Sequence, residues 1–369
     1  MQPTPTHGGP TSKTRKGPGL AAAVALAGAG VIAAHPAVSP APASAQLSGM
    51  RLMAAQDITW DEVFQSARTG ATDISNHFSA VPFPALQQVL ANQIGYVQGL
   101  LNGSVSFSDV SAEIQNHLTA VFGAPATDTT AAIPGALFGP FLPEGGATDT
   151  LYQSLDATVN STGTGIFAFI TLNHEQLFPL LADAIPSLLP ALGLDESALP
   201  QIDSLLQFAG SPLGGIVIGE LGTALSPMLQ LNDDISSITT ALSDSDWNAA
   251  LQDLANMPAN LASAYLNGYG EVDLMPILDQ LGIDLPPVEL VTGLPTTVTD
   301  LNVVLGGLLS GGGSLFDAIG LSADGGESIG ALDLSGLAVG PLASMVELSQ
   351  AIAEALGWDG SSDILASPF

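Results

Sequence analysis

Only a few residues of this chain have the types and spacing that catalysis or metal binding would require. Three histidines follow position 45, namely His77, His117 and His174. They are far apart along the chain, and none belongs to an H-x-x-x-H or H-x-E pattern of the kind that holds a catalytic metal. A metal-binding or general-base role stays open, but ordinary surface or helix-end histidines are the favoured interpretation.

A serine within a glycine run is the next candidate. Gly313 precedes Ser314, but Leu315 and Phe316 follow it, so the G-x-S-x-G pattern of a nucleophile elbow is incomplete. The pattern before the serine also predicts no strand, which an elbow needs. The glycine runs lack the lysine of a phosphate-binding loop, and the chain has no cysteine for a thiolate, a disulfide or a metal site.

Two short acidic segments could bind calcium weakly through their oxygen atoms. They are Asp244 to Asp246 and Asn232 to Asp234, and neither is followed by the glycine and distant glutamate of a helix-loop-helix calcium site. The simpler interpretation places these acids in the first turns of helices, where the helix dipole stabilises negative charge. We therefore predict no catalytic, cofactor-binding or metal-binding residues, and a protein that is not an enzyme.

The charge of the chain is strongly one-sided. It has 35 acidic and 5 basic residues, a formal net charge of −30, although only 11 % of its residues are charged. Three of the basic residues lie within the first 45 positions, so the rest of the chain carries −33. Such a surface repels nucleic acid and anionic lipid headgroups, and nucleic-acid binding is excluded as a function. With 369 residues, 46 % of them hydrophobic, the chain can form one large or two ordinary domains.

Residues 1–45 have the pattern of an export signal. A basic region that ends at Lys16 precedes an uncharged apolar run from Leu20 to Ala34, and Ala43-Ser44-Ala45 is a small-x-small cleavage site. The alternative is a membrane anchor that is never cleaved, but the run is shorter than the about twenty residues that span a bilayer. We expect residues 1–45 to direct export and to be removed.

The rest of the chain is predicted to be mainly α-helical. Many glycines and prolines indicate an irregular assembly of short helices with flexible glycine-rich loops, and no clear β-barrel pattern. We divide it into an N-terminal helical region 46–123, a linker or surface loop 124–165, and a leucine-rich helical region 166–369. Between Ile166 and Leu242 the prolines are frequent enough to limit each helix to two or three turns.

Local signals place several helix ends. Thr59 and Glu62 fit a capping box, and a second helix extends from Ala85 to Leu101, where Asn102 and Gly103 end it. Ser108 is predicted to cap a third helix. The last helix is predicted from about Pro341 to Gly357, followed by a frayed tail from Trp358.

Residues 247–316 carry the most distinctive pattern. Apolar residues recur from Trp247 to Tyr265 at helical spacing, and Pro258 is predicted to divide them into two short helices. Asn267 and Gly268 end the second helix. Two glycine runs then bracket a pair of leucines, which predicts a flexible segment that ends at Phe316.

The elements of this stretch also resemble a family signature. They are a tryptophan, an N-[IM]-P-A-N turn, an aromatic-Leu-Asn-Gly stop, a VDL-x-P-[IL]-L helix and a GGLLS-x-GGSLF loop, and they resemble the mycobacterial secreted proteins known as the outer-membrane porin GjpA family. The family loop often has proline where this chain has Gly311. The signature residues are Trp247, Asn256, Pro258, Asn260, Asn267, Gly268, Asp273, Gly306, Gly307, Gly312, Gly313, Ser314 and Phe316. The resemblance brings no catalytic or pore-lining residues.

The residues after position 45 do not themselves predict a membrane-spanning element. Proline, glycine or an acid interrupts every apolar stretch before about eighteen residues, and no series of alternating segments predicts a barrel. The nearest to a span, Phe208 to Leu225, contains Pro212 and Glu220. A pore would have to come from oligomerised amphipathic helices.

Two functions follow as hypotheses. The resemblance implies an exported cell-envelope protein that assists the passage of small solutes, with acidic faces lining an oligomer that prefers cations. The residues alone favour a secreted or cell-wall-associated, non-enzymatic helical interaction protein. The expected partners are envelope lipids, further copies of the chain or another protein, with no cofactor and no nucleic acid.

Overall fold

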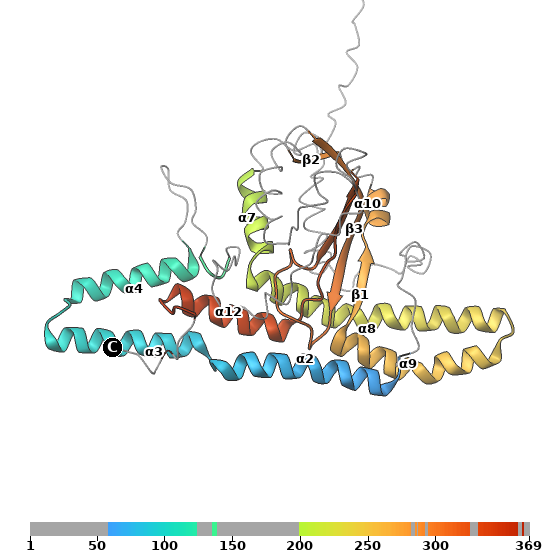
Figure 1. Ribbon diagram of the computed structural model, residues 1–369, viewed down its shortest axis with the longest axis horizontal. Coiled ribbons are helices and arrows are strands. Elements are labelled where there is room, and N and C mark those ends of the chain that lie inside the picture. The colour runs from blue at the N-terminus through green and yellow to red at the C-terminus, as the bar shows by residue number, and fades with distance from the viewer. Residues whose placement is uncertain are drawn as a thin grey trace, which may run out of the picture.

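Helices and one small antiparallel sheet make up the described part of the chain (Figure 1). The structure is a computed structural model that describes residues 58–123, 135–138, 199–281, 285, 287–291, 294–324, 331–360 and 364. The prediction of a mainly α-helical fold is confirmed. The export signal 1–45, His174 and most of the linker 124–165 lie outside the described residues.

Three helices form the N-terminal region: α2 (Trp60–Ala80), α3 (Pro84–Asn102) and α4 (Phe107–Phe122). α2 begins at the predicted capping box, in which Glu62 N donates to Thr59 Oγ1 and Thr59 N donates to a Glu62 carboxylate oxygen at 2.8 Å. α3 ends at the predicted stop. The prediction for α4 is wrong by two residues, because Ser106 rather than Ser108 forms the cap, with Asp109 as its partner.

Two long helices run through prolines. α8 (Pro212–Ser243) has 32 residues and contains Pro227, and α9 (Trp247–Asn267) has 21 residues and contains Pro258. The prediction of two- or three-turn helices between Ile166 and Leu242 is therefore wrong for α8, and the prediction of two helices around Pro258 is wrong as well. An interior proline costs a helix about 3 kcal/mol. Packing of the adjacent turns offsets this cost, since Ser226 is 0 % and Ala259 is 2 % exposed.

Three shorter helices complete the helical part: α7 (Leu199–Ala209), α10 (Met275–Leu281) and α12 (Pro341–Ala355). α12 confirms the predicted last helix. A small cluster of Ala353, Trp358 and Ile364 packs with Val81 and Ala91 from the α2–α3 region. Trp358 is 7 % exposed, so the prediction that the tail frays from this residue is wrong.

A five-stranded antiparallel sheet occupies the chain between α9 and α12. Its central strand β3 (Leu294–Gly306) pairs with β1 (Gly268–Asp273), β4 (Ile319–Asp324) and β2 (Val288–Val291), while β5 (Ala331–Leu334) pairs with β4. No strand is predicted from the sequence before the glycine-rich loop, and that prediction is wrong because β3 precedes the loop. Val272 and Asp273 of the signature likewise lie in a strand rather than in a helix.

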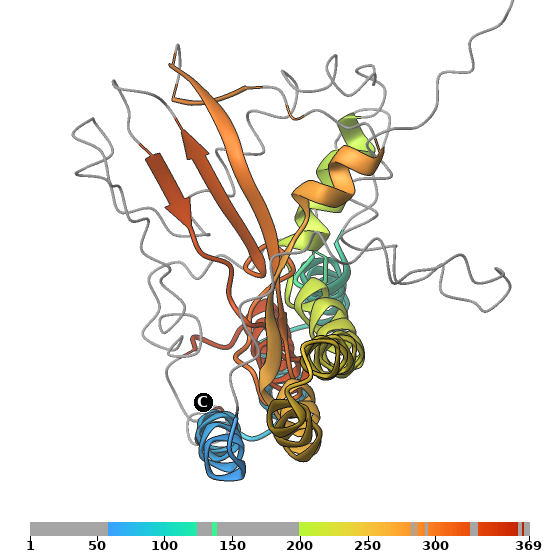
Figure 2. The same ribbon diagram turned by 90° about the vertical axis from the view of Figure 1, so that its right-hand side faces the viewer.

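The helices form a long base beneath the sheet. In Figure 1, α2, α3, α8 and α9 run along the long axis of the molecule. Figure 2 shows α2, α8 and α9 almost end-on, so they lie side by side. The α8–α9 hairpin extends past the sheet at one end of the base, and α3 and α4 extend past it at the other (Figure 1).

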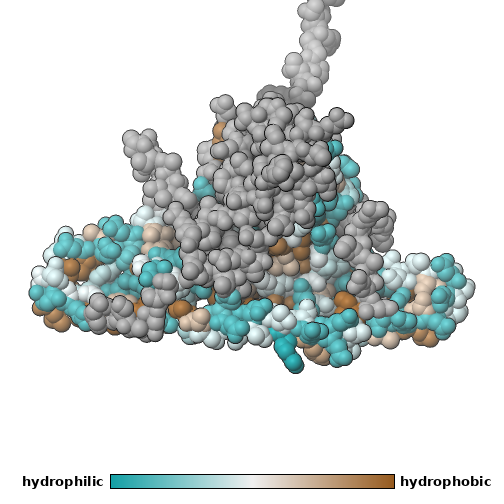
Figure 3. Space-filling model, viewed as in Figure 1, coloured by the Kyte–Doolittle hydropathy of each residue, from teal (hydrophilic) through white to brown (hydrophobic). Residues whose placement is uncertain are grey.

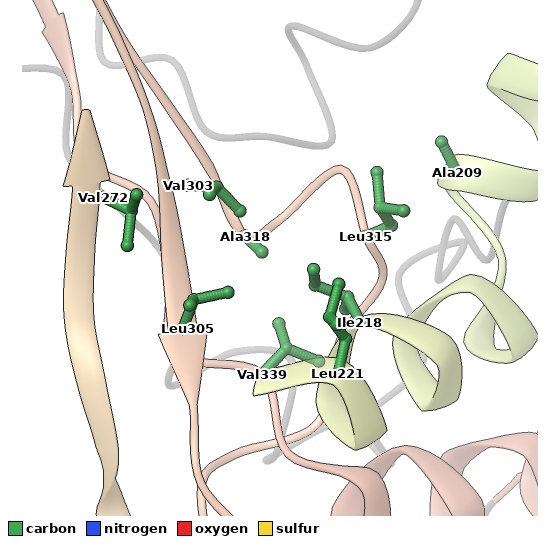
Figure 4. Packing of buried hydrophobic residues seen from close by; sticks show 9 residues of the cluster. All are labelled: Ala209, Ile218, Leu221, Val272, Val303, Leu305, Leu315, Ala318 and Val339. Carbon is green, nitrogen blue, oxygen red and sulfur yellow. The ribbon is translucent and has the colours of Figure 1, made fainter. Parts of the chain in front are cut away.

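The main hydrophobic core lies between α8 and the sheet (Figure 4). Ile218 and Leu221 of α8 lie beside Val339 and face the chain that leaves β3. The buried members of this core are Ala209, Ile218, Leu221, Val272, Val303, Leu305, Leu315, Ala318 and Val339.

On one face of α8, the helix backbone lies directly against the backbone of the glycine-rich loop and of the segment before α12. The face consists of Gly215, Gly219 and Gly222, and we call it the glycine face. A Cβ on Gly215 would overlap the carbonyl of Gly313, and a Cβ on Gly222 would lie 2.5 Å from the Gly306 carbonyl oxygen. The segment Gly306 to Phe316 is therefore packed and largely buried, and the prediction of a flexible segment is wrong.

We predict that Gly215→Ala lowers the free energy of unfolding by more than about 2 kcal/mol, because the added methyl group meets backbone that cannot move alone. Gly95→Ala is the matched control, since Gly95 is also helical and a Cβ there meets nothing within 4 Å. It should stabilise α3 by about 0.5–1 kcal/mol. Urea denaturation measures both, and equal stability of the two variants would contradict the close approach of α8.

Candidate functional site

Two segments of the signature stretch, around Gly268 and around Gly306, meet at one end of the sheet. Gly268 pairs with Gly306 at the end of the β1–β3 ladder. Gly307 N donates to Ser310 Oγ at 2.8 Å, and Ser310 Oγ donates to Asn267 O at 3.0 Å. A Cβ on Gly307 would lie 2.5 Å from Gly268 N. Backbone packing thus brings the signature residues Asn267, Gly268, Gly306 and Gly307 together. Glycine is required at position 307 because the backbones of the two segments touch there.

Glu347 of α12 holds the second half of the glycine-rich loop. Its side chain is 1 % exposed, and a carboxylate oxygen accepts a hydrogen bond from Gly313 N at 2.7 Å. A Cβ on Gly312 would overlap this carboxylate. Sequence reasoning missed Glu347, although one signal was present. The glutamate shares a helical face with small residues that are buried, namely Ala343, Ser344 and Ala351.

Ser314 takes part in a local turn with Asp317. Ser314 N and Oγ donate to one Asp317 carboxylate oxygen at 2.7 and 2.8 Å, and Asp317 N donates back to Ser314 Oγ at 3.3 Å. This is the same reciprocal arrangement that begins α2 and α4. A strand does precede Ser314, but the serine is 2 % exposed and its hydroxyl is engaged by Asp317, so the geometry does not favour a nucleophile.

The other signature residues lie apart from this loop. Trp247 begins α9 and is 66 % exposed, Asn260 is buried against α8, and Asp273 accepts from Met275 N at the start of α10. Asn256 and Pro258 lie within α9. Phe316 is buried, and its backbone N donates to Ala209 O at 2.9 Å. The signature residues therefore lie at several places along the fold, some of them buried and others, such as Trp247, exposed, and they do not form one cluster.

A polar groove of about 500 Å³ lies between α2 and the first half of the loop. Its lining comes from one face of α2, the end of α9 and the loop: Glu62, Gln65, Ser66, Thr69, Gly70, Asp73, Asn267, Leu309 and Ser310. The groove offers hydroxyl, amide and carboxylate groups and no basic or aromatic side chain. It can hold a small neutral or cationic polar molecule, but it contains no paired nucleophile and base.

Acidic side chains join α8 to α9 and β1. Asp234 is 3 % exposed and one carboxylate oxygen accepts from Gln230 at 3.0 Å and from Asn260 at 2.9 Å. Asp233 accepts from the Tyr269 hydroxyl at 2.6 Å. Burial raises the pKa of Asp233, and the hydrogen bond from Tyr269 partly opposes this shift. Burial also raises the pKa of Tyr269.

The interpretation that places the acidic segments at helix beginnings fits one residue. Asp246 is the N-cap of α9 and accepts from Ala249 N at 3.0 Å, whereas Asp244 is the C-cap of α8, so the interpretation is wrong for Asp244. Asp233 and Asp234 instead lie well inside α8, so the interpretation is wrong for Asn232 to Asp234. Within the described residues, no group of three or more histidine, aspartate or glutamate side chains is placed to hold a metal ion.

The two described histidines occupy helix positions. His77 lies in the last turn of α2, and burial lowers its pKa. In His117, Nδ1 lies 3.1 Å from the Tyr96 hydroxyl and Nε2 lies 3.3 Å from a Glu113 carboxylate oxygen. The contact with Tyr96 joins α3 to α4, and the contact with Glu113 lies within α4. The two side chains fit the interpretation as ordinary helix histidines.

Large hydrophobic side chains are exposed on the long base. Figure 3 shows hydrophobic residues at both ends of it. At one end the exposed residues of α3 are Leu86, Val89, Leu90, Ile94, Val97 and Leu101. At the other end those of α8 and the first part of α9 are Met228, Leu231, Ile235, Leu242, Trp247, Leu251 and Leu254. Contiguous apolar surfaces of this kind mark binding sites.

Among the described helices, α8 alone is long and apolar enough to cross a membrane, judged by length and composition. In the sequence, Pro212 and Glu220 are the residues that predict against a membrane span in this segment. In the structure Pro212 lies in the first turn, where proline is tolerated, and Glu220 is one exposed acid in a long helix. Nearly half of the apolar window is buried within the protein, and a buried core helix meets the same criteria.

Comparisons of the chain with family models, characterised proteins and solved structures find no match.

We predict that Glu347→Ala lowers the free energy of unfolding by about 2–4 kcal/mol, because it leaves Gly313 N without its acceptor and opens a cavity. Glu354→Ala is the matched control on the same helix, since Glu354 is exposed. It should change stability by less than about 0.5 kcal/mol. Thermal unfolding followed by circular dichroism compares them, and similar losses would contradict a special role for Glu347.

Tyr269→Phe is expected to raise the pKa of Asp233 further, because the hydroxyl donates its hydrogen bond to the ionised carboxylate. The variant should be less stable than the native chain at neutral pH by about 1–3 kcal/mol. The difference should shrink as the pH falls through the pKa of Asp233, since protonation weakens the bond that the variant lacks. Carboxyl ¹³C NMR titration follows Asp233 directly, and an unchanged or lower pKa would refute this role of Tyr269.

Proposed function

We propose that this chain is an exported, non-enzymatic protein of the cell envelope that binds a helical protein partner. The observation that carries the proposal is the exposed surface of residues 228–254, the end of α8 and the first part of α9, which we call the α8–α9 arm. The arm extends past the sheet (Figure 1) and bears seven exposed large hydrophobic residues. The export pattern of residues 1–45 and the resemblance to the GjpA family support the location.

The large apolar residues of the arm are exposed, and the residues buried within the arm are Asp234 and Ala250. Where α8 faces α9, polar and small side chains are buried, such as Asp234 of the arm and Asn260 and Ser263 of the part of α9 that follows the arm. Asp234 and Asn260 are hydrogen-bonded across the interface. The large residues lie on other faces of both helices and remain exposed. The arm is thus a helical hairpin whose large apolar side chains lie on its outside. Contact between these side chains and another apolar surface would lower the free energy of the protein.

The spacing of these residues fits a helical partner. Met228, Leu231, Ile235 and Leu242 lie at steps of three, four and seven on α8, and Trp247, Leu251 and Leu254 lie at steps of four and three on α9. These are the steps of the a and d positions of a coiled coil.

The charge of the arm restricts the class of partner that it can bind. Residues 228–254 contain five acidic and no basic residues. The acids would repel a second acidic arm and attract a basic helix. A partner with an apolar stripe flanked by lysine or arginine therefore fits both the spacing and the charge. Anionic lipid headgroups do not fit, since the chain opposes them with acidic side chains.

Small-solute passage is the second candidate function, and the length and apolar composition of α8 favour it. In this alternative, several copies would assemble α8 into a pore whose acidic groups select cations. Retention of the chain in envelope membranes after an alkaline carbonate wash, together with cation conductance in planar bilayers, would support the pore. Release by the wash would support attachment through a partner.

The interaction proposal is tested with a synthetic helical peptide of three heptads that has leucine at the a and d positions and lysine at e and g. We expect the full-length chain to bind it, and Leu251→Glu to weaken the affinity by at least about tenfold, because a charge enters an apolar contact. Met345→Glu makes a similar charge change at an exposed residue of α12 and should leave the affinity unchanged. Isothermal titration calorimetry measures the affinity of each variant for the peptide.

A second peptide with glutamate in place of the lysines completes this test. It should bind at least about tenfold more weakly, because its charges have the sign of the arm. Equal binding of the two peptides, or no effect of Leu251→Glu, would show that the arm does not recognise a basic helix.

A further inference from the structure

Helix α3 has its polar face toward the protein and its apolar face toward solvent. Its inner face contains Gln88, which is 9 % exposed, and Asn92, whose side-chain nitrogen donates to Leu356 O at 2.8 Å. Tyr96 and Gly99 lie on the same face, where Tyr96 contacts His117 of α4. The outer face contains the exposed residues Leu86, Leu90, Ile94, Val97 and Leu101. An amphipathic helix on a protein surface normally has the opposite orientation.

The outer face of α3 is also free of charge. Among the described helices, α3 is the only one with no aspartate, glutamate, lysine or arginine, and none of these occurs from Ile74 to Ser108. This neutral segment belongs to a chain with a net charge of −30. Any surface on which two copies of the chain meet must keep acidic groups apart, and the outer face of α3 satisfies that condition.

From these observations we propose that the outer face of α3 binds the same face of a second copy. A basic partner would be attracted to the acidic helices rather than to this neutral one. Helices that lie on lipid surfaces carry lysine or arginine on a solvated polar face. α3 has neither residue, and its polar face contacts α4 and the end of α12. With a basic partner and a lipid surface disfavoured, the surface that fits is the outer face of α3 in a second copy, which is uncharged, apolar and of equal length.

The positions of the apolar residues suit an antiparallel pair related by a two-fold axis. The stripe from Leu86 to Leu101 has its centre between Gln93 and Ile94. In an antiparallel pair with this centre on the axis, Leu86 lies opposite Leu101 of the second copy, and Leu90 lies opposite Val97 of the second copy. Each contact then occurs twice, as a two-fold interface requires. This dimer does not involve the α8–α9 arm, so it can form whether or not the arm binds a partner.

Single cysteine substitutions test the arrangement, because the chain has no cysteine of its own. In the purified full-length chain, Ile94→Cys should form a disulfide-linked dimer under mild oxidation, since the two thiols meet near the axis. Two copies of Leu86→Cys should not cross-link, because their positions would be about 22 Å apart along the helices. A mixture of Leu86→Cys with Leu101→Cys should cross-link. Leu251→Cys, exposed on the arm, is the control for random collision and should stay monomeric on non-reducing gels.

Sedimentation velocity provides the second test. The native chain should sediment as a dimer at micromolar concentration. Ile94→Glu should raise the dimer dissociation constant by at least about 100-fold, because it brings two carboxylates together in an apolar contact. Leu251→Glu makes the same charge change on the arm and should leave the constant unchanged. Circular dichroism confirms that both variants are folded, as expected for exposed positions.

Each contrary result overturns the proposal. Cross-linking of Leu86→Cys with itself would show a parallel arrangement, and equal cross-linking of all four variants would show collision without an interface. A native chain that is monomeric at micromolar concentration would exclude the dimer. If that monomer instead floated with phosphatidylcholine vesicles, and Ile94→Glu abolished flotation, the face would bind lipid rather than a second copy.

Discussion

The close contact between the glycine face of α8 and the backbone around the glycine-rich loop is the constraint on which the fold depends. Gly215 and Gly222 leave no space for side chains between the helix and the carbonyls of Gly313 and Gly306. The loop is then fixed from the other side, because Glu347 of α12 accepts from Gly313 N. Helix, loop and last helix thus form one packed unit, and the sheet is attached to it through β3.

Because α3, α8 and α9 pack through glycine and polar residues, many of their large hydrophobic side chains are exposed on the surface. The buried residues of α8 include four glycines and few large apolar side chains, namely Ile218 and Leu221. Beyond the sheet, α8 and α9 are joined through Asp234 and Asn260 rather than through leucines. α3 likewise contacts the protein through Gln88 and Asn92. Apolar faces of both ends therefore stay exposed, which favours a role in association rather than in catalysis.

Charge divides the exposed apolar faces into two kinds. The α8–α9 arm carries acids such as Asp244 and Asp246 beside its apolar stripe, so a basic partner suits it and a second copy does not. α3 carries no charge, so it is the place where two strongly acidic molecules can meet with the least repulsion. One acidic chain can in this way keep self-association and partner binding on separate surfaces.

The sequence by itself determined the local features of this protein: its charge, the capping box at Thr59, the helix ends at Gly103 and Gly268, and the last helix from Pro341. These depend on residues within one turn of each other. Only the tertiary structure decided that α8 and α9 continue through their prolines, that β3 precedes the loop and that the loop is buried. Each of these depends on contacts between distant segments, such as Gly215 with Gly313 and Gly313 with Glu347. Local propensity cannot report a contact whose two halves lie 34 or 98 residues apart, as these do.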